Sequence, residues 1–96
     1  MRATVDGTVI AEAPEEELVR IEGNWYFPPS AVVDGALAQS PTPYTCPWKG
    51  DAAYFHLDAN GERVADAAWS YPEPKEAARE IAGHLAFDRS KGITVG

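Results

Sequence analysis

The sequence predicts a small single domain, residues 1–96, that is mainly β, with about seven short antiparallel strands and one short helix near the C-terminus. Three observations lead to this fold class. The chain has only 96 residues, which fits one domain with one core. Eight glycines and eight prolines divide it into short apolar runs, which favour strands over helices. Asn60-Gly61 lies between two such runs and favours the type I′ turn of a tight hairpin.

Four short strands are expected in the first third of the chain, at residues 3–5, 8–11, 18–21 and 25–27. Asp6-Gly7 separates the first two strands and has the composition of a tight hairpin turn. Gly23-Asn24 has similar turn chemistry between the next two strands. Pro28-Pro29 ends the fourth strand, because proline has no N–H group to donate to a sheet.

The segment that follows is expected to contain no strand. Residues 31–38 favour one or two helical turns, which the hydroxyl group of Ser30 could cap. Residues 39–43 contain two prolines together with serine and threonine, so we expect a loop there.

The central hairpin is expected to extend from residue 51 to residue 70. A two-residue turn at Asn60-Gly61 pairs Leu57 with Val64, and an uninterrupted ladder then pairs Tyr54 with Ala67. Large residues face small ones across this ladder, and both of its faces are largely apolar, so the hairpin should be central in its sheet. Without a bulge, the ladder also gathers three polar residues at one end of one face: Lys49, Asp51 and Ser70.

The remaining elements are short. The two prolines in Tyr71-Pro72-Glu73-Pro74 end the hairpin. Residues 75–82 carry a narrow apolar stripe, which favours a short helix that stops at Gly83. Two further strands are expected at residues 85–87 and 93–95.

The charge and the cysteine content restrict the classes of partner. The net charge of −7 argues against nucleic acid and against anionic membrane surfaces, because both attract lysine and arginine. No run of about 18 apolar residues is present to span a membrane. The N-terminus lacks an apolar signal core and the single cysteine cannot form an internal disulfide, so we expect a cytoplasmic location. One cysteine with two histidines does not fit a cysteine-based structural zinc site, and no motif identifies a cofactor.

The most informative segment is Thr45-Cys46-Pro47-Trp48-Lys49-Gly50, which precedes an aromatic strand. Lys49 could hold an anionic ligand, and Gly50 would let that ligand approach the backbone. The alternative for Lys49 is an ordinary ion pair with one of three nearby acids, Asp51, Asp66 or Glu73. Cys46 could be a nucleophile whose pKa is lowered by Lys49, or a small buried residue without reactivity.

Aromatic residues near this segment could form a pocket. Trp48 and Tyr71 lie beside prolines at strand ends, where the rim of a pocket is expected. Trp69 and Tyr54 could line the same pocket, or they could pack in the core opposite alanines.

Five segments of the chain resemble one known family. The most specific is Thr45-x-Cys46-Pro47-x-Lys49-Gly50-x-Ala52-x-Tyr54, and the others are residues 7–11, 25–28, 68–74 and 81–87. Over nearly the whole chain they are similar to the bacterial "domain of unknown function 427" family. Its members are small, mainly β proteins, so the resemblance implies the same fold. The family is sometimes labelled nucleotidyltransferase-like, but this chain has no Gly-Ser signature with paired aspartates for metal-assisted phosphoryl transfer. The segment between Ile21 and Trp25 is shorter than in typical relatives, so no part of the site is assigned to it.

Two classes of function use the segment around Cys46. The first is a binding domain for a small molecule with an anionic group, in a pocket formed by Thr45, Trp48, Lys49, Gly50, Trp69 and Tyr71. The second is an enzyme that uses Cys46 or Lys49, with His84 or Asp51 as the proton carrier. His84 also fits a polar surface position, since a single histidine is often structural.

A third class is a structural or interaction module. In this class an exposed Trp25-Tyr26-Phe27 segment forms a subunit contact, because aromatic residues are enriched at interfaces. The protein would then be a homodimer, whereas the other classes are compatible with a monomer. We expect the small-molecule binding domain first, and the interaction module before the enzyme.

Overall fold

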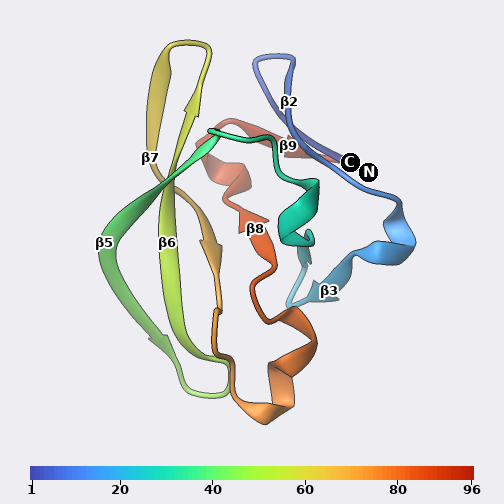
Figure 1. The fold of residues 1–96 in the computed structure, drawn as a ribbon, viewed down its shortest axis with the longest axis vertical. Coiled ribbons are helices and arrows are strands. Elements are labelled where there is room, and N and C mark those ends of the chain that lie inside the picture. Colours follow the sequence, from blue (N-terminus) through green and yellow to red (C-terminus); the bar gives the residue numbers. More distant parts are fainter.

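Nine β-strands form three antiparallel sheets in the computed structural model, which describes residues 1–96 (Figure 1). The strands are β1 Arg2–Val5, β2 Thr8–Glu12, β3 Val19–Ile21, β4 Asn24–Tyr26, β5 Leu37–Cys46, β6 Gly50–Ala59, β7 Glu62–Ser70, β8 Leu85–Phe87 and β9 Ile93–Val95. Four short 3-10 helices connect them: η1 Glu15–Glu17, η2 Pro29–Ala31, η3 Glu76–Ile81 and η4 Arg89–Lys91. The prediction of a mainly β, antiparallel fold is confirmed. None of the helices has the length and apolar character needed to cross a membrane.

The largest sheet has the strand order β5-β6-β7-β8 (Figure 1). β8 continues it toward the β3–β4 hairpin, since Phe27, directly after β4, exchanges two backbone hydrogen bonds of 2.8 Å with Leu85. The third sheet has the order β2-β1-β9 and brings the two ends of the chain together. The β3–β4 hairpin thus lies beside the large sheet, close to β8.

Three hairpins close with the same kind of two-residue turn. The turns are Asp6-Gly7, Glu22-Gly23 and Asn60-Gly61, and both residues of each have a positive φ. The φ values are 48°, 54° and 55° at the three first positions, and 79°, 79° and 74° at the three glycines. These are the dihedral signs of a type I′ turn, which favours asparagine or aspartate followed by glycine. Glutamate at the first position of the second turn departs from that preference.

The main core is shared by the large sheet and the three-stranded sheet. Its buried side chains come from both of them and include Ala3, Val5, Ile10, Ile93, Leu57, Ala68, Leu85 and Phe87. Phe27 and Phe87 pack edge to face at its centre, with ring centroids 5.7 Å apart. Burial of this apolar surface is the main contribution that stabilises the fold.

The other face of the large sheet carries a row of residues from neighbouring strands. Tyr54 of β6 pairs with Trp69 of β7, and Trp69 pairs with Ala86 of β8. Phe27 pairs with Leu85, and this pairing places Tyr26 beside Ala86 as the next residue in the row. Because Ala86 is small, the indole of Trp69 reaches across it and donates a 3.1 Å hydrogen bond from Nε1 to the hydroxyl of Tyr26.

The predicted register of the β6–β7 ladder is correct next to the turn and wrong farther along. Leu57 pairs with Val64, as expected. A bulge that contains Asp66 follows, and beyond it Tyr54 pairs with Trp69 instead of with the alanine two residues earlier. The bulge therefore places two large aromatic residues opposite each other.

The segment before β6 also differs from the prediction. The helical turns expected at residues 31–38 are limited to the end of η2, and the loop expected at residues 39–43 is part of β5. β5 is an edge strand, so Pro41 and Pro43 can belong to it without depriving a second neighbouring strand of hydrogen bonds.

The helix expected at residues 75–82 is shorter and tighter than an α-helix. η3 is a 3-10 helix, and its backbone is non-helical at Ala78, where φ is −123°. Pro74 and Gly83 limit the segment to a length at which an isolated α-helix is not stable.

Candidate functional site

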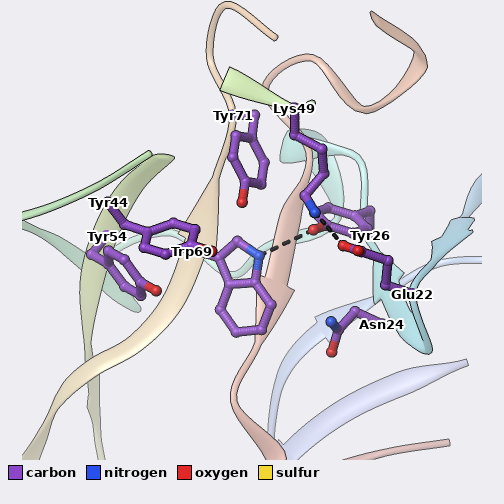
Figure 2. Close-up of a pocket in the computed structure, with 8 residues that line it drawn as sticks. All are labelled: Glu22, Asn24, Tyr26, Tyr44, Lys49, Tyr54, Trp69 and Tyr71. Carbon is purple, nitrogen blue, oxygen red and sulfur yellow. Dashed lines mark hydrogen bonds and ion pairs between the residues drawn. The ribbon is translucent and has the colours of Figure 1, made fainter. Parts of the chain in front are cut away.

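A cleft of about 200 Å³ lies between this second face of the large sheet and the β3–β4 turn (Figure 2). Eight residues line it: Glu22, Asn24, Tyr26, Tyr44, Lys49, Tyr54, Trp69 and Tyr71. They include all four tyrosines of the chain. Aromatic walls with a few converging polar groups are the usual composition of a small-molecule site.

Trp69 lies at the centre of the cleft, between Tyr54 and Tyr26 (Figure 2). The ring centroids of Tyr54 and Trp69 are 6.4 Å apart, and the rings are tilted by 49°. The hydrogen bond from the indole Nε1 to Tyr26 holds Trp69 from the other side. The aromatic wall is therefore fixed before any ligand binds.

The cleft offers hydrogen bonds rather than metal ligands. No group of three or more His, Cys, Asp or Glu side chains is arranged to hold a metal ion. Burial raises the pKa of Tyr26 and Tyr54, and it raises the pKa of Tyr71 to about 12. These three hydroxyl groups are therefore protonated at neutral pH and can donate hydrogen bonds to a ligand.

Lys49 is the only cationic residue that lines the cleft, and it is only 5% exposed. It ends the three-residue turn between β5 and β6. The residue that follows it, Gly50, has a φ of 108° and lies against the backbone of residues 73–75, just before η3. The ammonium group forms an ion pair with Glu22. It also lies 4.7 Å from the ring centroid of Trp48 and 5.5 Å from that of Tyr71.

The charge of Lys49 is retained despite its burial. Burial lowers the pKa of the ammonium group, but the hydrogen bonds with Glu22 and Cys46 outweigh this effect and leave the pKa above its ordinary value. The hydrogen bond from Lys49 in turn holds the pKa of the Glu22 carboxyl below its ordinary range. Both groups are therefore ionised at neutral pH.

Cys46 lies at the start of the same turn and is buried beside Tyr71. Burial raises the pKa of its thiol. Hydrogen bonds from the backbone N–H groups of Lys49 and Trp48 and from the Lys49 ammonium lower the pKa by a larger amount in total. The net result is a pKa below the ordinary value. The residue is nevertheless only 5% exposed, so the thiol does not face the solvent as an accessible nucleophile.

The structure brings together three of the six residues predicted to bind a ligand. Lys49, Trp69 and Tyr71 line the cleft. Trp48 lies at its edge, with the ring over the ammonium group of Lys49. Gly50 is buried and shapes the turn without lining the cleft.

The other candidates lie elsewhere. Thr45 donates a 2.8 Å hydrogen bond to Asp51, and both side chains are exposed. His84 follows η3, and its Nδ1 lies 3.2 Å from a carbonyl oxygen of its own loop. Ser70 borders a separate groove, so the gathering of Lys49, Asp51 and Ser70 that an uninterrupted ladder predicts is wrong.

Four residues of the cleft have no counterpart in the predicted site: Glu22, Asn24, Tyr26 and Tyr44. Two of them, Glu22 in the β3–β4 turn and Asn24 at the start of β4, lie in the segment between Ile21 and Trp25, to which the sequence assigns no role. The ion-pair partner of Lys49 is also different from all three acids expected for it. One signal in the sequence indicates that this turn belongs to the site. The turn has glutamate at the position where the two equivalent turns have Asp6 and Asn60.

The segment Trp25-Tyr26-Phe27 is not an exposed surface. Tyr26 and Phe27 are buried, and the guanidinium of Arg20 covers the half-buried Trp25 at 5.0 Å from its ring centroid. The assumption behind a subunit contact through this segment is therefore wrong.

A family model described as a domain of unknown function (DUF427) matches residues 1–95. This range includes every strand and every residue that lines the cleft. No curated protein is significantly similar to the chain.

Proposed function

Since the chain belongs to the DUF427 family, whose description assigns no function, we propose from the cleft itself that the protein binds a small organic molecule with an anionic group. In this proposal Lys49 holds the anionic group, and the rings of Tyr44, Tyr54 and Trp69 contact the rest of the molecule. The cleft, at about 200 Å³, is smaller than the roughly 300–1,000 Å³ of sites for drug-sized ligands. The ligand should therefore be no larger than a single substituted ring.

The observation that carries the proposal is the buried positive charge of Lys49 on an aromatic cleft. A charge withdrawn from water loses hydration free energy, and here the Glu22 carboxylate, the Cys46 thiol and two rings compensate for that loss, so the ammonium group keeps its charge inside the cleft. A ligand that brings negative charge to this ammonium gains a charge-assisted hydrogen bond where little water competes. A purely structural position would be better served by an apolar side chain of similar volume.

A reducing, cytoplasmic compartment is part of the proposal. Cys46 is the only cysteine, its thiol is free, and hydrogen bonds from the backbone N–H groups of Lys49 and Trp48 hold its pKa below the ordinary value despite its burial. Such a thiol stays reduced most readily in the cytosol. Recovery of the native protein in a secreted or membrane fraction of its cells would contradict this part.

The experiment compares single-ring acids with their amides by NMR titration of the labelled protein. We expect benzoate to shift the Trp69 indole N–H resonance and benzamide to do so far less, because only the acid carries the charge that Lys49 can hold. Lys49→Met should abolish benzoate binding. Arg63→Met is the matched control, since Arg63 is an exposed cation at the β6–β7 turn and pairs there with Asp58.

Equal binding of benzoate and benzamide would contradict the proposal, and so would a Lys49→Met variant that is folded and binds benzoate as well as the unmodified protein. Thermal unfolding of each variant shows whether it is folded. Loss of binding in the Arg63→Met variant would mean that net charge, rather than Lys49, governs the interaction.

A further inference from the structure

Glu22 reaches Lys49 from the surface of the protein. Its side chain is 55% exposed, whereas that of Lys49 is 6% exposed. One carboxylate oxygen, Oε1, accepts a hydrogen bond from the Lys49 ammonium. The other, Oε2, lies 3.5 Å from Nε1 of Trp48. The two donors thus face the two oxygens of a single carboxylate.

The backbone at Glu22 is unfavourable for glutamate. Its φ of 54° is in the left-handed region, which asparagine, aspartate and glycine tolerate better than other residues. The equivalent turns of this chain have Asp6 and Asn60 at the same position. The turn itself therefore does not require glutamate, but a longer side chain is what brings a carboxylate to Lys49. Strained positions of this kind are frequent at ligand sites.

We propose that Glu22 occupies a carboxylate subsite in the free protein, and that the ligand is a single-ring aromatic carboxylic acid whose carboxylate replaces Glu22 on Lys49 and Trp48. This inference rests on the proposed function of the cleft. It adds the class of ligand, and it makes the β3–β4 turn a built-in competitor for the site.

A carboxylate fits the subsite better than a phosphate. The subsite has one cation and one neutral N–H donor, which match a single negative charge with two oxygens. A dianionic group would bring a second charge to a protein whose net charge is already −7. The same location already accommodates a carboxylate of the chain itself.

The aromatic part of the ligand follows from the walls next to the subsite. Tyr71 lies beside Lys49, and Trp69 and Tyr54 extend the wall away from it (Figure 2). Rings that meet at a tilt or with an offset are the favoured contacts between aromatic groups. The small volume of the cleft leaves space for one ring.

Displacement of Glu22 requires little rearrangement. The side chain is already half in solvent, so its carboxylate can be fully hydrated after a rotation of the side chain. Because it is tethered next to Lys49, it competes as a ligand at high effective concentration. Removal of its charge should therefore tighten the binding of an aromatic acid by about two- to fivefold, the range expected for the loss of one partly exposed ion pair.

The test is a calorimetric titration of benzoate, benzamide and phenylphosphonate into the unmodified protein and two variants. Glu22→Gln keeps the size of the side chain and removes its charge. Glu22→Asn removes the charge and gives the turn a residue that it prefers, as at Asn60. Asp51→Asn is the matched control. Asp51 lies on β6, and its carboxylate accepts a hydrogen bond from Thr45 outside the cleft.

We expect both Glu22 variants to bind benzoate about two- to fivefold more tightly than the unmodified protein. Benzamide binding should be unchanged by these substitutions, Asp51→Asn should have no effect, and phenylphosphonate should bind more weakly than benzoate. Tighter binding of phenylphosphonate would overturn the assignment of a carboxylate subsite.

The outcomes separate this inference from the proposed function. If benzoate binds and Lys49→Met abolishes its binding, but neither Glu22 variant binds it more tightly, the inference fails and the proposed function stands. If benzoate binds neither the unmodified protein nor the folded Glu22 variants, both fail. Thermal unfolding of the two Glu22 variants shows whether each is folded at the temperature of the titration.

Discussion

Tyr71 shows how one buried side chain contributes to the electrostatics of the cleft. It is 3% exposed, and its ring lies 5.5 Å from the ammonium group of Lys49. Burial raises the pKa of the Tyr71 hydroxyl to about 12, although the positive charge of Lys49 acts in the opposite direction. Desolvation is therefore stronger here than the attraction between a tyrosinate and the neighbouring cation.

This shift predicts a loss of stability at alkaline pH. In the unfolded chain Tyr71 loses its proton near its ordinary pKa of 10.0, whereas in the folded protein it keeps the proton up to about 12. Between these values the unfolded state binds fewer protons, so the free energy of unfolding falls as the pH rises, by about 1.4 kcal/mol from this group between neutral pH and pH 11. Urea unfolding at pH 9, 10 and 11 should show a smaller decrease for Tyr71→Phe. Parallel decreases in the two proteins would contradict the prediction.

Among the elements, β5 and β7 are connected by their bulges. Each strand has extra residues opposite the middle of β6. The hydroxyl groups of Ser40 and Thr42, in the β5 bulge, both donate hydrogen bonds to the carboxylate of Asp66 in the β7 bulge. Nδ1 of His56, on β6 between them, accepts a hydrogen bond of 3.1 Å from the backbone N–H of Asp66. The two irregularities are therefore one structural unit.

Substitution of Asp66 should weaken this unit in a defined order. Asp66→Asn keeps one acceptor oxygen and a residue that tolerates φ of 50°, so we expect a small decrease in the urea midpoint. Asp66→Ala removes both acceptors and places a Cβ-bearing apolar residue in left-handed backbone, so we expect a larger decrease. Equilibrium urea unfolding followed by tryptophan fluorescence measures both. An alanine variant as stable as the asparagine variant would show that the carboxylate does not hold the bulges together.

These bulges mark the limit of what the sequence predicts about the fold. The pairing of Leu57 with Val64 follows from Asn60-Gly61, because a two-residue turn determines the adjacent register. The shift farther along depends on contacts of Asp66 with residues about 25 positions earlier, for which no local pattern exists. The sequence does not predict β5 for a different reason. Its prolines are typical of loops, and they are tolerated here because the strand is at an edge.

The candidate site also has one part that the sequence predicts and another part that depends on tertiary contacts. Lys49, Trp69 and Tyr71 could be predicted because they lie in two short aromatic-rich segments, residues 45–54 and 68–74, at the ends of predicted strands. Glu22 is 27 positions from Lys49, and Tyr26 enters the cleft only through the pairing beside β8. Residues that meet through the tertiary fold leave no spacing in the sequence from which their contact could be inferred.

In the molecule as a whole, the first and last strands belong to one sheet. β1 lies between β2 and β9, and Val5 pairs with Ile93. Ile93 is 2% exposed and belongs to the main core together with Phe87 and Ile10. The last few residues of the chain therefore contribute directly to the packing that stabilises the whole domain.

Truncation of this side chain should destabilise the entire protein. Ile93→Ala removes three buried carbon atoms, and we expect the free energy of unfolding to fall by about 3 kcal/mol. This is a large fraction of the roughly 5–15 kcal/mol typical of a domain. Thr94→Ala is the control, since Thr94 is exposed on the same strand and should change the value by less than about 0.5 kcal/mol. A loss for Ile93→Ala no larger than for the control would show that β9 is detached in solution.

The backbone groups of Arg2 and Gly96 form two hydrogen bonds with each other, of 3.2 Å and 2.9 Å. Both ends of the chain thus leave the molecule at one point, on the side away from the β5–β6 turn (Figure 1). A short peptide could join them, and new ends could be opened at the exposed Gly61 to give a circular permutant. For the same reason, protein anchored to a sensor surface by either terminus would present its cleft to the solution.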